Sequence, residues 1–211
     1  MHELGQLFAN NQAWAEEKAL HEPDFFRRLA RNQEPRFLWI GCSDSRVPAE
    51  EIVGLSPGEM LVHRNIANLV LDSDLNCQSV IQFAVDMVGV EHVIVCGHYG
   101  CAGVLAALRA DTLGLIDSWV CNVREVRTRH HAQLARLADE NQRFDRLCEL
   151  NVIEQVSNVC HAAAIRNAWA RGRQLAVHGW IYGVADGILR DLAMSVNSAS
   201  ELTERYEAAC G

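Results

Sequence analysis

The chain has 211 residues, of which 49% are apolar and 22% are charged, so it can form a buried core and is neither disordered nor fibrous. Its net charge of -8 argues against nucleic acid and anionic membranes as partners, because both bind clustered basic surfaces. The first residues lack a basic start and an apolar stretch of signal length, and no run of residues is long enough to cross a bilayer. We therefore expect a cytoplasmic protein.

Two helices are predicted before the first strand. The spacing of apolar residues predicts an amphipathic helix near residues 3–20. Pro23 is expected to open the second helix, since proline is favoured at a first helical position. Such an arm packs either on the sheet of its own chain or on a partner chain, and the pattern alone leaves both alternatives open.

Strands and helices then alternate along the chain. Apolar runs rich in β-branched and aromatic residues predict strands near residues 37–41, 59–63, 92–96 and 174–181. Between them, helical patterns cover residues 74–89, begin again at about residue 102 and dominate to about residue 171.

The end of the chain is expected to add a hairpin and a last helix. Asp186-Gly187 predicts the hairpin turn, and Ser198 with Glu201 predicts a capping box that opens the helix. The order of elements predicts an α/β fold with a mostly parallel β-sheet flanked by helices on both faces. We expect one domain over residues 1–211, in which residues 1–34 form an amino-terminal helical arm.

The eight cysteines are expected to be reduced thiols, because the chain is long and spreads them through periodic apolar segments. Cys77 and Cys160 fall in helical series of apolar residues and are interpreted as small core residues. Histidines in or beside apolar segments are interpreted as hydrogen-bonded core residues without chemistry, namely His63, His92, His161 and His178. A solvated helix face, rather than an anion site, is expected for Arg124, Arg127, Arg129, His130 and His131.

Two short motifs each follow a predicted buried strand. Cys42-Ser43-Asp44-Ser45-Arg46 follows the run that ends near residue 41, and His98-Tyr99-Gly100-Cys101 follows the run that ends near residue 96. In parallel α/β folds the carboxyl ends of the strands form the edge that binds ligands. Two thiols and one imidazole from two strand ends are typical of a catalytic zinc site, since the fourth tetrahedral position can go to water.

Asp44 and Arg46 are expected to decide what occupies the fourth position. Asp44 can reach either the metal or the guanidinium of Arg46, whose rigid fork suits both oxygens of a carboxylate. Paired with Arg46, Asp44 leaves the position open; bound to the metal, it closes the site. The alternative is a permanently closed Cys2HisAsp site, which does not explain the adjacent arginine.

The segments Gly41–Pro48 and Gly97–Cys101 closely resemble the β-class carbonic anhydrases. The resemblance covers nearly the whole chain and includes motifs at residues 57–59, 63–68, 114–116, 151–156 and 178–180. It implies that Cys42, His98 and Cys101 hold one zinc ion, with Asp44 as the fourth ligand or as the partner of Arg46. It also implies reversible hydration of carbon dioxide, an arm laid over a partner subunit, and homodimers that often pair into tetramers.

The resemblance also implies a substrate pocket. Gln33 matches a family residue that donates a hydrogen bond toward substrate, and Phe83 matches an aromatic residue that lines the apolar pocket, in both cases across the dimer interface. The alternatives are a solvated loop for Gln33 and core packing for Phe83. Ala102 stands where the family commonly has glycine, but its backbone N–H can still face the substrate.

A second anion site is implied by the bicarbonate-inhibited subgroup of the family. There, the residues that match Trp39, Arg64 and Tyr182 hold bicarbonate near the Val47-Pro48 turn, and this favours the state with Asp44 on the metal. An indole N–H, a guanidinium and a phenol are suitable donors to a small oxyanion. The alternative is that Trp39 and Tyr182 only pack while Arg64 pairs with a nearby carboxylate.

Two other functions remain open at this point. Some close relatives of the family hydrolyse carbon disulfide or carbonyl sulfide with the same fold and metal, and access to the pocket would decide between these substrates. A non-catalytic zinc or thiol-redox protein is supported only by the number of cysteines. It leaves the placement of Asp44 and Arg46 unexplained.

Overall fold

The computed structural model describes residues 2–31, 34–110 and 112–211. The chain divides into two compact units, residues 1–34 and 35–211. The first contains α1 (His2–His21) and α2 (Phe25–Arg31). The prediction that Pro23 opens the second helix is wrong by two residues, because Pro23 lies in a turn in which the Phe25 N–H donates to the Glu22 carbonyl at 2.9 Å.

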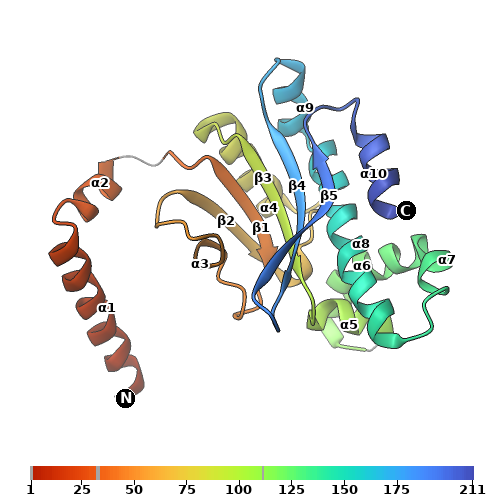
Figure 1. Ribbon diagram of the computed structural model, residues 1–211, viewed down its shortest axis with the longest axis horizontal. Helices are drawn as coiled ribbons and strands as arrows, with labels where there is room; N and C mark the ends of the chain where they lie inside the picture. Colours follow the sequence, from red (N-terminus) through yellow and green to blue (C-terminus); the bar gives the residue numbers. More distant parts are fainter. Residues whose placement is uncertain (1, 32–33, 111) are drawn as a thin grey trace. The chain divides into compact units, whose positions relative to one another are not determined.

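The second unit is built on a five-stranded sheet in the order β2-β1-β3-β4-β5. The strands are β1 (Phe37–Cys42), β2 (Met60–Asn65), β3 (His92–His98), β4 (Ala176–Gly183) and β5 (Ile188–Val196). The first four strands run parallel, and β5 returns antiparallel beside β4 after the predicted turn at Asp186-Gly187 (Figure 1). The predicted α/β fold with a mostly parallel sheet is confirmed.

One face of the sheet carries nearly all of the helices. Leu38 and Ile40 of β1 and Val93 and Val95 of β3 point into the main core. This core is closed by helices that follow the strands, namely α4 (Leu75–Gln82), α5 (Ala102–Arg109), α6 (Asp117–Arg129), α7 (His131–Leu134), α8 (Glu140–His161), α9 (Ala163–Ala170) and α10 (Leu202–Cys210). Short helical turns join them, namely η1 (Ile66–Asn68), η2 (Phe83–Val88) and η3 (Gly114–Ile116).

The opposite face of the sheet is covered much more thinly. A smaller apolar cluster lies there, with Trp39, Ile94 and Cys96 buried in it, and α3 (Ala49–Val53) contributes Ala49. Among the described residues of the second unit, α3 is the helix that packs on this face. The helices therefore flank the sheet unequally, a detail that the order of elements could not predict.

Two local predictions differ from the structure. The helix expected over residues 74–89 is α4 followed by the π-helical turn η2, which ends at the left-handed Gly89. The capping box is wrong, because α10 begins at Leu202 and the Glu201 carboxylate instead accepts the backbone N–H of Asn197 at 3.2 Å. No helix among the described residues has the length and apolar composition needed to span a bilayer.

The long helix α8 packs closely against the sheet at Gly97. A Cβ atom on this residue would lie 2.6 Å from Cγ2 of Val152, so only glycine lets β3 and α8 pack at this distance. Gly97 directly precedes His98, and the close approach therefore fixes the end of the strand that carries this histidine.

Gly97→Ala should destabilise the protein by about 1–3 kcal/mol through overpacking against Val152. The free energy of unfolding from urea denaturation measures the effect. Gly5→Ala is the control, because no atom lies within 4 Å of the added Cβ and alanine favours the helix. A Gly97→Ala protein as stable as the wild type would show that the strand and the helix are not tightly packed.

Candidate metal centre

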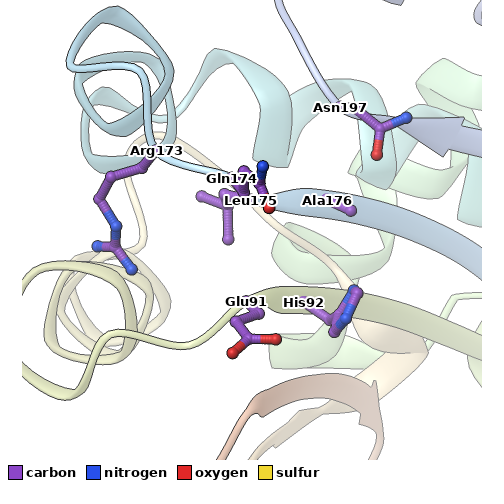
Figure 2. A pocket seen from close by; sticks show the side chains of 7 residues that line it. All are labelled: Glu91, His92, Arg173, Gln174, Leu175, Ala176 and Asn197. Carbon is purple, nitrogen blue, oxygen red and sulfur yellow. The ribbon is translucent and has the colours of Figure 1, made fainter.

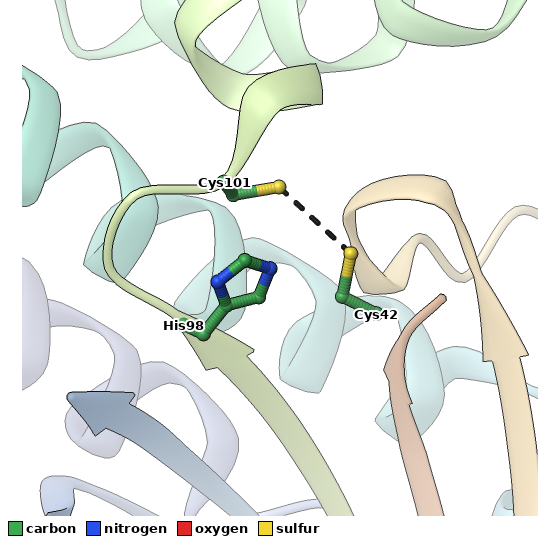
Figure 3. A group of neighbouring side chains, drawn as sticks. All are labelled: Cys42, His98 and Cys101. Atoms are coloured by element: carbon green, nitrogen blue, oxygen red, sulfur yellow. Dashed lines mark hydrogen bonds between the residues drawn. The ribbon is translucent and has the colours of Figure 1, made fainter. Parts of the chain in front are cut away.

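Cys42, His98 and Cys101 come together at the carboxyl edge of the sheet. Cys42 is the last residue of β1, His98 the last residue of the neighbouring parallel strand β3, and Cys101 the residue before α5. Their ligand atoms all lie within 4.8 Å of one another, and all three residues are buried (Figure 3). The two Sγ atoms are 3.9 Å apart. Parallel pairing of β1 and β3 is thus what joins two motifs that are distant in the sequence.

The donor atoms fit a zinc ion. His98 is held by its Nδ1 atom, which lies 3.0 Å from the Tyr99 carbonyl, so Nε2 is the nitrogen left for a metal. This Nε2 is buried and has no hydrogen-bond partner among the described residues. An unpaired buried polar atom costs about 1–3 kcal/mol, which a metal bond at this position would remove. Two sulfur donors and one nitrogen suit tetrahedral zinc with one position left open.

The two thiols are electrostatically coupled. The neighbouring Cys101 thiol lowers the pKa of Cys42 against the effect of burial, and the nearby His98 side chain and the backbone N–H groups of Asp44 and Ala67 lower it further. The same contact, together with burial, raises the pKa of Cys101. One proton therefore leaves the pair readily, and a divalent cation supplies the charge that removes the second.

Asp44 is paired with Arg46 and lies outside the cluster of ligand atoms. Arg46 donates from Nε to Oδ1 at 2.9 Å and from Nη2 to Oδ2 at 2.7 Å, and its backbone N–H also donates to Oδ1. The guanidinium holds the pKa of Asp44 well below its usual range. Oδ2 lies 3.7 Å from His98 Nε2, so the carboxylate stands beside the cluster without entering it. Two arrangements were expected, with Asp44 either on the metal or on Arg46. The structure has the second, open arrangement.

Two arginines fix the loop that carries Asp44. Arg46 donates to the Gly100 carbonyl at 3.4 Å, which joins the loop after β1 to the loop after β3. Arg64 donates to the carbonyl of Cys42 at 2.8 Å and also to the carbonyl of Asp44. Arg64 is therefore bound to backbone, and the alternative that it pairs with a nearby carboxylate is wrong.

The other residues expected in the second anion site share the thinly covered face of the sheet. The register places Trp39, Arg64 and Tyr182 on this face. Trp39 and Val47 are buried, Tyr182 is half-buried, and Pro48 precedes α3. Arg64 and Tyr182 lie one residue before the ends of their strands, and the indole Nε1 of Trp39 reaches over Gly41, so the three donors share one face near this edge.

The residues expected in the substrate pocket are only partly described. Gln33 lies outside the described residues. Phe83 is 47% exposed at the start of η2, so the alternative that it is a simple core residue is wrong. Ala102 is the exposed first residue of α5, where a backbone N–H has no partner within the helix.

The structure gives a role to two residues of the motif at residues 151–156, to which the sequence alone assigned none. Asn151 of α8 donates to the Ala67 carbonyl at 2.9 Å, and Gln155 accepts the backbone N–H of Val70 at 2.9 Å. These contacts hold the chain after β2 on α8, and Ala67 in this segment belongs to the same buried cluster as Cys42. The sequence did contain one sign of this role, because polar residues interrupt the apolar helical series of residues 147–159.

The predicted solvated face is in fact partly an ion-pair network. Buried Glu154 accepts from His130 Nε2 at 2.7 Å, from Arg129 and from the Tyr206 hydroxyl, so it joins α6, α8 and α10. Arg127 donates to the carbonyls at the end of α5. The core role expected for His92 and His178 agrees with their mutual contact of 3.1 Å.

A separate pocket of about 450 Å³ lies at the opposite edge of the sheet, where β3 and β4 begin (Figure 2). Its charged groups already have partners within the protein. Glu91 binds Arg36, and Arg173 donates to the carbonyls of Val85 and Val90. Because the metal-ligand cluster is at the other edge, this pocket takes no part in it.

Known proteins resemble the chain over most of its length. The family model described as carbonic anhydrase matches residues 37–189. A carbonic anhydrase of Emericella nidulans is 46% identical over 187 residues, which are 89% of this chain and 82% of that protein. A carbonic anhydrase of Candida albicans is 36% identical over 205 residues, 94% of this chain and 71% of that protein.

Solved structures agree with these sequence matches. A tetrameric β-carbonic anhydrase of Sordaria macrospora has a TM-score of 0.88 and 38% identity, covering 93% of this chain and 100% of that chain. A Coccomyxa β-carbonic anhydrase in complex with acetazolamide has a TM-score of 0.92 and 36% identity, covering 100% of this chain and 97% of that chain.

Removal of any one of the three clustered donors should weaken zinc binding by more than about 100-fold, since loss of even an indirect partner of a ligand costs about 10–100-fold. Metal analysis after dialysis against a weak chelator checks this for Cys42→Ser, His98→Ala and Cys101→Ser. Cys121→Ser is the control, because Cys121 lies outside the cluster. Full zinc content in one of the three variants would remove that residue from the ligand set.

Proposed function

The chain belongs to the β-class carbonic anhydrase family, and on this basis we propose that it hydrates carbon dioxide reversibly to bicarbonate and a proton with one zinc ion per chain. The observation that carries the proposal is the Asp44–Arg46 pair beside a buried Cys-His-Cys cluster whose imidazole Nε2 has no partner among the described residues. A purely structural zinc site needs neither the carboxylate nor the arginine.

Carbon dioxide is small, apolar and uncharged, so its hydration depends on a supply of nucleophile near neutral pH. Cys42, His98 and Cys101 would hold a zinc ion, which would act as a Lewis acid and lower the pKa of water. In a carbonic anhydrase whose zinc is held by three histidines, this pKa is about 7. Two thiolates neutralise more of the metal charge than imidazoles do. We therefore expect a more alkaline working range for this chain.

Asp44 orients the attack on carbon dioxide. Its Oδ1 accepts two hydrogen bonds from Arg46, whereas Oδ2 accepts one and faces His98 Nε2. Oδ2 therefore keeps a lone pair on the side of the cluster, where it can accept the O–H of the attacking oxygen and direct a remaining lone pair at the carbon. Because Arg46 keeps Asp44 ionised, Asp44 acts as a hydrogen-bond acceptor and not as a proton donor.

Inhibition by bicarbonate at a site away from the metal is part of the proposal. Bicarbonate held by Trp39, Arg64 and Tyr182 near Val47-Pro48 competes for Arg64, whose hydrogen bonds position the Cys42 and Asp44 carbonyls. Loss of these bonds frees the loop, so that Asp44 can leave Arg46 and bind the metal. A ligand shifts such an equilibrium only by its difference in affinity for the two states.

Low pH is proposed to favour the same closed state. Asp44 binds a metal only when ionised, and its pKa lies well below the usual range of aspartate, so mild acid does not protonate it. Acid instead lowers the supply of hydroxide, which competes with Asp44 for the fourth position. The enzyme is therefore expected to lose activity below about neutral pH and to regain it as pH rises.

Self-association is proposed to complete the active site. Apolar side chains remain exposed on α1 and on the α4–η2 segment, namely Leu4, Leu7, Phe8, Leu20, Leu75, Phe83 and Met87. A second copy of the chain can cover them, with residues 1–34 as an arm on the partner and residues 35–211 as the carbonic anhydrase domain. The tetrameric relative from Sordaria macrospora supports homodimers that pair into tetramers. The cytoplasmic location stays a prediction.

Asp44→Ala should keep zinc through three ligands yet lose activity by about 100-fold or more at every pH, because the attacking oxygen loses its orienting acceptor. Stopped-flow hydration of carbon dioxide with a pH indicator measures the rate. Arg46→Lys should also fail, since an ammonium cannot hold both carboxylate oxygens. Glu51→Gln, which alters an exposed carboxylate of α3, is the control. An active Asp44→Ala enzyme would contradict the mechanism in which Asp44, held by Arg46, orients the attacking oxygen.

Trp39→Phe and Tyr182→Phe should each weaken inhibition by bicarbonate at least about tenfold, since each removes one donor to the anion, while zinc remains bound. Initial rates at rising bicarbonate concentration give the inhibition constants. Trp180→Phe is the matched control, because Trp180 lies on the same face of the sheet but is not a proposed donor. Equal inhibition of all variants and the wild type would mean that no such site exists.

A further inference from the structure

A second group of metal-binding side chains lies beside α4, outside the cluster described above. His63 is on β2, and Asp74 and Cys77 are at the start of α4, where their spacing puts them on one side of the helix. One ligand atom from each of the three residues lies within 4.8 Å of the other two. The three side chains thus converge from two elements of the fold.

The sequence interpreted Cys77 as a small core residue and His63 as a hydrogen-bonded core residue, and both are indeed buried. Burial does not explain why a carboxylate approaches them. Cys77 has no hydrogen bond within the described part of the chain, and the contact of His63 is to the Asn65 amide at 3.3 Å. Asp74 uses Oδ1 to accept the Asn76 N–H at 3.1 Å, which leaves Oδ2 for another partner.

We propose that His63, Asp74 and Cys77 form a second metal site for a thiophilic divalent cation such as zinc. Imidazole, thiolate and carboxylate are the donors that zinc takes in proteins, whereas magnesium and calcium require sets of oxygen donors. One thiolate and one carboxylate neutralise the two charges of the cation, so the buried site carries no net charge. Asp74 is half-buried, so solvent can reach the site from its side and a water molecule can serve as the fourth ligand.

Such a metal ties together both ends of the segment that runs along the catalytic cluster. Between His63 and Asp74 the chain passes through Ala67 and Asn68, whose φ values of 64° and 48° lie in the left-handed region that favours glycine. Ala67 belongs to the same buried cluster as Cys42. A metal bound to His63, Asp74 and Cys77 therefore restrains the strained segment and is expected to raise the thermal midpoint.

The second site should fill after the first. It offers three protein ligands, and one of them, Asp74, already caps α4. The test is a titration of the zinc-loaded, full-length protein with cobalt(II) chloride, followed by absorption and by analysis of bound zinc and cobalt. The expected result is one added cobalt per chain, retained zinc, and a thiolate-to-cobalt charge-transfer band.

Matched variants identify the ligands. Cys77→Ala should abolish the band, and Asp74→Asn, which keeps a good helix cap, should weaken cobalt binding at least about tenfold. His63→Gln should act like Asp74→Asn. If one of the three ligand variants fails to fold, the other two still test the proposal. Cys160→Ala, at another buried cysteine, should bind cobalt like the wild type. No added cobalt, cobalt only in exchange for zinc, or an unchanged band in Cys77→Ala would each overturn the proposal.

Discussion

The ion pair between Asp44 and Arg46 is the contact on which the active site depends. The guanidinium uses both carboxylate oxygens, so it keeps a potential fourth ligand beside the cluster but out of it. The same guanidinium reaches the Gly100 carbonyl, and it therefore joins the two loops that supply the sulfur and nitrogen donors. In the proposed mechanism this interaction keeps the fourth metal position open, and it also joins the two loops.

The fold makes this arrangement possible by placing β1 and β3 side by side and parallel. Their carboxyl ends present Cys42 and His98 at one edge, although the two residues are far apart in the sequence. The helices on the main face supply rigidity, since α8 packs against Gly97 and holds the chain after β2 through Asn151 and Gln155. The thinly covered face is the one that carries Trp39, Arg64 and Tyr182, and Tyr182 pairs in register with His98, so the proposed regulatory site lies beside the metal-ligand cluster at the same edge of the sheet.

The sequence predicted those features that depend on local patterns. Strands near residues 37–41 and 92–96 followed from their apolar runs, and the convergence of Cys42, His98 and Cys101 followed from the rule that parallel strands end at one edge. The role of Arg64 could not be predicted, because its acceptors are carbonyl oxygens, which every residue has.

Tertiary contacts account for the other differences. Buried Glu154 pairs with Arg129 and His130, which were expected on a solvated face. A partner on another helix cannot be predicted from the spacing of these charged residues themselves. His63, Asp74 and Cys77 likewise match no known ligand spacing, since a strand and a helix start bring them together. Phe83 is exposed although it lies in a helical pattern of apolar residues. The spacing of apolar residues predicts the helix, but it does not tell whether its own chain or a partner covers a given side chain.

A crystal structure of the zinc-loaded enzyme, determined at alkaline pH without bicarbonate and again at acid pH with bicarbonate, tests the central claim most directly. At alkaline pH it should show zinc on Cys42, His98 and Cys101, a solvent ligand, and Asp44 on Arg46. In the second crystal Asp44 should lie on zinc. Asp44 on zinc in both crystals, or zinc bound without one of the three ligands, would contradict an open site controlled by the Asp44–Arg46 pair.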